Sequence, residues 1–193
     1  GRQVTVQDVF EAVGKHSVGA MTDEDLFGLE QVACPSAGAC GAQFTANTMA
    51  IASEFLGIAA LGSGSVPAND PKKADVARAA GERVMGLVRQ NLRPRDIMTK
   101  AAFENAIASV ATTGGSTNAV LHYLAIASAA EVPWTIDDFE RMRKRVPVLC
   151  NLKPSGEYVA VDFHRAGGVP QVLKMLLAHG LLHGDCITIT GRT

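Results

Sequence analysis

Two cysteines six positions apart are the residues of this sequence that most directly suggest chemistry. Cys34 and Cys40 lie in a run of small residues with Pro and Gly, over 33–41, which predicts a loop. A helix is predicted just beyond it, over 43–57, and the free N–H groups at a helix N-terminus stabilise a thiolate. Cys40 is therefore a candidate metal ligand or reactive thiol. Spacing alone favours two inert buried cysteines, because a single pair so spaced is no zinc or ferredoxin signature.

Small polar residues gather at two predicted helix starts. Thr45, Asn47 and Thr48 open the helix over 43–57, and capping accounts for one of them but not for all three. The run Gly-Gly-Ser-Thr-Asn over 114–118 places hydroxyls and an amide after two glycines, a pattern that suits a bound carboxylate or phosphate. A plain turn between two helices explains the second pattern equally well.

Other polar and sulfur-bearing residues have structural interpretations. Glu104 and Asn105 stand among apolar helix residues, which favours a buried, hydrogen-bonded pair that fixes helix packing. Cys150 and Cys186 lie in apolar, strand-like runs and are expected to be core thiols. The sequence contains no phosphate-binding loop, nucleophile elbow or paired-histidine zinc motif.

The composition narrows the class of protein. The chain has 193 residues, 47% of them apolar and 19% charged, and a net charge of −1. This balance predicts no nucleic-acid partner and no anionic membrane partner, and no apolar run reaches the ~20 residues of a membrane-spanning helix. Four cysteines are too few for a disulfide scaffold. We expect a soluble, globular, intracellular protein that acts on a small molecule.

Apolar periodicity predicts a helix-rich α/β fold. Short extended segments are expected at three places, and a lone strand cannot satisfy its backbone groups, so we expect them to belong to a larger parallel sheet. This pattern suggests a piece of a longer protein. The expected helices cover 5–20, 23–32, 43–57, 72–91, 100–110, 119–130, 137–145 and 171–179, and the expected strands 146–150, 158–161 and 186–190.

Several long motifs, in order along essentially the whole chain, resemble the dihydroxy-acid dehydratase family, which includes phosphogluconate and aldonic-acid dehydratases. One departure is Ala42-Gln43, where Gly-Met is more usual. The form Thr-Ala-Asn-Thr-Met resembles the branched-chain enzyme rather than the sugar-acid members. The motifs cover 33–49, 100–107, 114–122, 152–156, 180–186 and 188–191.

The resemblance implies an iron–sulfur enzyme that also uses Mg²⁺. Its cluster is held by three cysteines, one of which corresponds to Cys40, and a 2Fe–2S cluster is favoured over 4Fe–4S. Cys34 matches a family cysteine that is not the usual ligand. The other cluster cysteines and most Mg²⁺ ligands would precede Gly1, and the serine base would follow Thr193. No residue of the chain is identified as catalytic; Thr45, Asn47, Ser116 and Thr117 are expected to line the substrate pocket.

The implied domain is the N-terminal α/β domain of the enzyme. Residues 1–185 would form its C-terminal portion, and residues 186–193 a strand leading towards a C-terminal domain. The full-length enzyme would be a homodimer, in the cytoplasm or in an organellar stroma or matrix.

The implied reaction is a hydro-lyase step of valine and isoleucine biosynthesis, which converts 2,3-dihydroxy-3-methyl acids to 2-oxo acids. A sugar-acid dehydratase, acting on an aldonate or phosphogluconate, is the alternative within the family. A non-catalytic structural fragment is the alternative outside it. We expect the isolated chain to be inactive.

Overall fold

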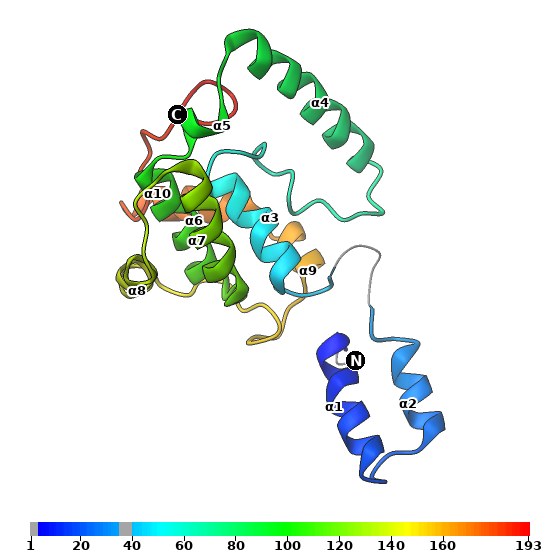
Figure 1. The fold of residues 1–193 in the computed structure, drawn as a ribbon. Coiled ribbons are helices and arrows are strands. Elements are labelled where there is room, and N and C mark those ends of the chain that lie inside the picture. Colours follow the sequence, from blue (N-terminus) through cyan, green and yellow to red (C-terminus); the bar gives the residue numbers. More distant parts are fainter. Residues whose placement is uncertain (1–3, 35–39) are drawn as a thin grey trace.

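The computed structural model describes residues 4–34 and 40–193, and these are mostly helical (Figure 1). The centre of the predicted loop, residues 35–39, lies outside the described residues. The helices of the described residues are α1 (Val6–Ser17), α2 (Asp23–Glu30), α3 (Thr45–Phe55), α4 (Lys73–Gln90), α5 (Pro94–Ile97), α6 (Lys100–Thr113), α7 (Asn118–Ala130), α8 (Ile136–Arg145), α9 (Ala160–Arg165) and α10 (Gly168–Ala178).

The core forms where α3, α6 and α7 pack on one another, with α8 against α6 and α10 against α3 (Figure 1). Phe103 of α6 is fully buried at its centre. Its ring meets the edge of Tyr123, with the centroids 5.8 Å apart, and the indole of Trp134 at 5.6 Å. Aromatic pairs at these separations add to the stabilisation from apolar burial. The α6 helix is therefore the central element of the fold.

Local sequence signals set the ends of α6. The Thr99 hydroxyl accepts a hydrogen bond from the Ala102 N–H, 3.2 Å away, and satisfies one of the free donors of the first turn. Gly114 ends the helix in a left-handed conformation, with φ +63°, which a residue without a Cβ adopts at low cost. The turn that follows leads directly into α7.

The eight helices expected from the sequence are confirmed, with ends that differ by a few residues. Two short helices were missed. Pro94 occupies the first position of α5, where its missing N–H costs nothing, so a residue that cannot lie inside a helix begins one here. The α9 helix begins at Ala160, inside a segment that was expected to be a strand.

No named strand forms among the described residues, so the strand assignments were wrong there and the parallel sheet is not confirmed. The pairing present is one isolated parallel bridge, between Leu152 and Tyr158. In the segment 146–150, the Leu149 and Cys150 N–H groups donate instead to the Thr112 carbonyl at the end of α6, at 2.9 and 3.1 Å.

Residues 186–190 fold back on themselves rather than forming a ladder. The Ile189 N–H donates to the Gly57 carbonyl at 2.8 Å, and the Thr188 N–H donates to the Arg192 carbonyl at 2.9 Å. A strand needs a second strand in register, and none of the described residues supplies one here.

Three helices lie at the edge of the structure. The α1 and α2 helices pack on each other, and Figure 1 shows this pair beside the main body. The α4 helix has no buried residue, and Val88 on it is 70% exposed. Among the described residues, no helix is long and apolar enough to cross a membrane.

Gly115 is the glycine at which we expect a side chain to disturb the core most directly. A Cβ there would lie 2.8 Å from the Cγ2 of buried Thr48 and 3.1 Å from the Cγ1 of Val110. We predict that Gly115→Ala lowers the free energy of unfolding by about 1–3 kcal/mol, as overpacking does. Urea unfolding followed by circular dichroism measures this.

Gly81→Ala is the matched control, because a Cβ at Gly81 on exposed α4 meets nothing within 4 Å. This change should stabilise the chain by about 0.5–1 kcal/mol. Equal effects of the two substitutions would contradict the close approach of Gly115 to Thr48.

Candidate functional site

The side chain of Asn47, in the first turn of α3, holds the backbone around Cys40. Its Nδ2 donates to the Cys40 carbonyl at 2.9 Å and to the Ala42 carbonyl at 2.7 Å. Both partners are acceptors, so both N–H donors of the amide are used and its orientation is determined. Asn47 therefore positions the cysteine loop.

Two further segments hold the same loop. The Gln43 N–H donates to the Lys153 carbonyl at 2.7 Å, and its side-chain amide donates to the Thr113 hydroxyl at 2.9 Å. The Ala160 N–H donates to the Gly41 carbonyl at 2.8 Å. Gln43 is 2% exposed, so its amide is a buried anchor. The departure from the family pattern at this position therefore has a structural role here.

A pocket of about 300 Å³ opens beside this loop. We call it the Cys40 pocket, and it lies between the start of α3, the loop over 64–68, the first residue of α4 and the start of α9. Its lining residues include Cys40, Gln43, Asn47, Ser65, Val66, Lys73 and Phe163. The pocket contains two of the predicted site residues, Cys40 and Asn47.

A buried carboxylate holds the loop that walls the pocket. Glu54 of α3 is 5% exposed, and its two oxygens accept the N–H groups of Gly62 and Gly64. Burial raises the pKa of Glu54, and the hydrogen bonds from the two glycines act in the opposite direction. A Cβ at Gly64 would lie 2.8 Å from the Glu54 Oε1, so this contact requires glycine.

Thr45 and Ser116, two other predicted site residues, meet in a separate polar cluster. Their hydroxyls are 3.2 Å apart, and the Asn118 side chain donates to the Thr45 hydroxyl at 2.9 Å. The Thr48 hydroxyl accepts the Ser116 N–H at 2.9 Å. Groups expected to bind an anion are thus engaged with one another, which joins α3 to the turn before α7.

Thr117 is exposed and lies outside this cluster. It lines a different pocket, of about 530 Å³, together with Gly114, Gly115 and residues of α8. The structure therefore separates Asn47, beside Cys40, from the other three expected substrate-pocket residues. Thr45 contacts Ser116, and Ser116 lines the second pocket together with Thr117.

The thiol of Cys40 is free and partly buried. Burial raises its pKa, and the nearby Cys34 raises it further. The expectation that a helix N-terminus stabilises this thiolate was wrong, because α3 begins only at Thr45, with Phe44 as its N-cap. A bound metal ion would itself displace the proton from a thiol of this kind.

Cys40 fits the role of one cluster ligand, because its free thiol borders a pocket and its backbone is fixed by Asn47. The described residues contain no group of three or more His, Cys, Asp or Glu side chains placed to hold a metal ion. Cys34 is exposed, in contrast to Cys40.

The core interpretation of the remaining cysteines is confirmed. Cys150 and Cys186 pack against the hydrophobic core, and burial is the main cause that raises the pKa of each thiol.

The pair Glu104 and Asn105 also fixes packing, as expected. Asn105 exchanges two hydrogen bonds with the His183 backbone, at 2.9 and 2.8 Å, and Glu104 meets the His183 ring at 2.6 Å.

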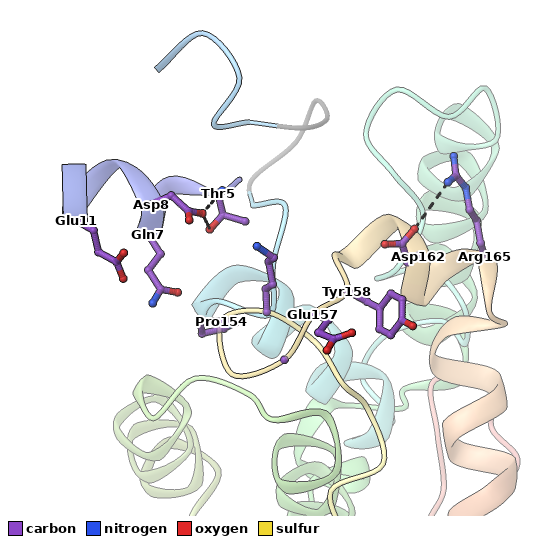
Figure 2. A pocket seen from close by; sticks show the side chains of 11 residues that line it. Thr5, Gln7, Asp8, Glu11, Pro154, Glu157, Tyr158, Asp162 and Arg165 are labelled. Carbon is purple, nitrogen blue, oxygen red and sulfur yellow. Dashed lines mark hydrogen bonds and ion pairs between the residues drawn. The ribbon is translucent and has the colours of Figure 1, made fainter. Parts of the chain in front are cut away.

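A larger pocket, of about 700 Å³, lies between α1 and the segment 153–165 (Figure 2). It contains none of the predicted site residues. Two of its carboxylates serve local structure: Asp8 accepts the Thr5 N–H at 2.8 Å, and Asp162 pairs with Arg165 at 3.8 Å. The Cys40 pocket is therefore the better candidate for chemistry.

The fold and the site define a helical domain segment that presents one fixed cysteine to a pocket with mostly apolar walls. The chain belongs to the dihydroxy-acid/6-phosphogluconate dehydratase N-terminal family, whose model matches residues 1–193. It is 58% identical over its whole length to dihydroxy-acid dehydratase 2 of Burkholderia lata and to dihydroxy-acid dehydratase of Thermosynechococcus vestitus. It is 55% identical to dihydroxy-acid dehydratase 1 of Cupriavidus pinatubonensis. The chain spans 35%, 34% and 35% of the length of these three relatives.

The sequence contains signals for two residues of the Cys40 pocket, Gln43 and Lys73, that were not predicted as site residues. Gln43 was noted as a departure, and a buried amide before a helix start suggests an anchor. Lys73 begins a helix directly after a loop rich in Gly, Ser and Pro. No local pattern marked His183 as the partner of Glu104 and Asn105, because 78 residues separate it from Asn105.

We predict that Asn47→Asp loosens the cysteine loop. The carboxylate has no N–H to donate and would face two carbonyl oxygens, at a cost of about 1–3 kcal/mol. Hydrogen–deuterium exchange of the peptide over 40–47, followed by mass spectrometry, should become about tenfold faster.

Asn91→Asp is the control, since Asn91 ends α4 and takes no part in the loop. It should leave the exchange of that peptide unchanged. Unaltered exchange in Asn47→Asp would show that the two hydrogen bonds do not hold the loop.

Proposed function

We propose that the protein containing this chain is a dihydroxy-acid dehydratase, a hydro-lyase that converts 2,3-dihydroxy-3-methyl acids to 2-oxo acids in branched-chain amino-acid biosynthesis. The identity of 55–58% to relatives of that name, over every residue of the chain, carries the proposal. These names favour it over a sugar-acid dehydratase, although the family model covers both kinds of enzyme.

An iron–sulfur cluster, preferably 2Fe–2S, would supply a Lewis acid for the leaving hydroxyl, and Mg²⁺ would supply charge stabilisation at the substrate carboxylate. Cys40 would be the cluster ligand that this chain provides. Asn47 and Gln43 keep its backbone in place, and α3 and α6 keep those two amides in place. The chain's part in catalysis is thus to hold one thiol rigidly beside a pocket.

The quaternary and cellular context is part of the same proposal. We propose a homodimer located in the cytoplasm, or in the stroma or matrix of an organelle, with a small-molecule substrate. The segment 186–193 would lead towards the C-terminal domain of the full-length enzyme and its sheet; the resemblance to the family supports this, since the described residues provide no strand partner for it.

Cys40→Ser in the full-length enzyme tests the assignment of the cluster ligand. We predict that it abolishes both activity and cluster binding, because a serine hydroxyl is a poor iron ligand. Iron and sulfide content and the visible absorbance of the purified protein measure the loss.

Cys150→Ser and Cys34→Ser are the matched controls. Cys150 packs against the core, so its replacement should cost only stability, on the order of 1 kcal/mol. A variant Cys40→Ser that keeps its colour and its iron while Cys34→Ser loses both would move the ligand to Cys34.

We further predict that the isolated chain does not turn over 2,3-dihydroxyisovalerate. It offers one ligand of a three-cysteine set, and no group suited to a metal ion exists among the described residues. An assay for the 2-oxo acid product, with the full-length enzyme as the positive control, measures this. Turnover by the pure chain would show that the site is complete within it.

A further inference from the structure

Lys73 provides the one charged side chain among the described residues that line the Cys40 pocket. It is the first residue of α4, and its Nζ donates to the Val66 carbonyl at 3.1 Å. An ammonium group has three N–H donors, so this contact leaves donors for a ligand.

No carboxylate of the described residues forms an ion pair with Lys73, although two acids are close in sequence. Asp70 accepts the Lys72 backbone N–H at 2.8 Å, and Asp75 pairs with Arg78 at 3.2 Å. No Asp or Glu lines the pocket among the residues that the structure describes. A cation without a counter-ion in a concave site raises the local concentration of anions.

The two amides of the pocket are already engaged. Asn47 donates to the Cys40 and Ala42 carbonyls, and the Gln43 side chain donates to Thr113. The Ser65 hydroxyl lies 3.4 Å from the His164 Nδ1. Lys73 is therefore the strongest donor left for a molecule that enters the pocket.

We propose that Lys73 donates a hydrogen bond to the carboxylate of a small organic acid in the Cys40 pocket, in addition to the charge stabilisation that Mg²⁺ would supply, and so selects anionic substrates. This rests on the proposed function, since the substrate of that enzyme is the acid that reaches the pocket. A neutral polyol of the same size can accept a hydrogen bond from the ammonium group, but it gains no attraction between opposite charges there. Lys73 is thus a specificity-determining residue.

Steady-state kinetics of the full-length, cluster-loaded enzyme tests the proposal. Lys73→Gln should raise the KM for 2,3-dihydroxyisovalerate about tenfold, the loss expected for one charge-assisted hydrogen bond, with little change in kcat. Lys73→Arg should restore KM to within about threefold of the unaltered enzyme's value, since it keeps the charge.

Lys72→Gln, at the adjacent exposed lysine, is the control and should have the KM of the unaltered enzyme. Lys73→Met, which keeps the apolar stem, provides a second neutral variant, and iron content confirms that each variant is loaded.

Alkylation of Cys40 in the cluster-free, full-length protein gives a readout independent of activity. The rate with anionic iodoacetate is divided by the rate with neutral iodoacetamide, and both are measured at Cys40 by peptide mass spectrometry. Lys73→Gln and Lys73→Met should lower this ratio about three- to tenfold, because the anion is no longer attracted. Lys72→Gln should leave it unchanged.

Both readouts must change for the proposal to hold. An active enzyme in which Lys73→Gln and Lys73→Met alter neither KM nor the ratio, or alter only one of them, overturns it. An enzyme without dehydratase activity whose ratio still falls in Lys73→Gln refutes the proposed function and the assigned substrate, while the anion site itself stands.

Discussion

The packing of α3 against α6 is the contact on which the rest of the structure depends. Ala52 on α3, and Ala102 and Ala106 on α6, are fully buried in the hydrophobic core that these two helices share. At one end of this contact Gly115 leaves room for Thr48, whose hydroxyl accepts the Ser116 N–H. Close approach is thus combined with a hydrogen bond that sets where α7 begins.

The same contact creates the candidate site. Because α3 is fixed on α6, the Gln43 amide reaches Thr113 at the end of α6, and Asn47 reaches the carbonyls on either side of Gly41. Burial raises the pKa of the Cys40 thiol, so this position does not by itself favour the thiolate. The fold provides a fixed position for the thiol beside a pocket that Lys73 lines. The charge of a bound metal ion would stabilise the thiolate.

The helices could be predicted because their signals are local. Apolar periodicity together with Thr99 before α6 and Gly114 after it depends on neighbouring residues only. The strands were mispredicted for the opposite reason. An apolar, β-branched run such as 186–190 is compatible with a strand, but a strand needs a partner in register, and Ile189 instead donates to the Gly57 carbonyl.

The sequence by itself determined the family, the helix-rich class and the candidate cysteine. Motifs and apolar periodicity depend only on residues that are neighbours in the chain. Only the tertiary structure decided what each polar residue contacts. It placed Asn47 on the cysteine loop, Thr45 against Ser116 and Lys73 in the Cys40 pocket. The contact of Thr45 with Ser116 joins residues 71 positions apart in the chain. Hydrogen-bond partners and pockets arise from how helices pack, and spacing along one helix does not specify which neighbour it meets.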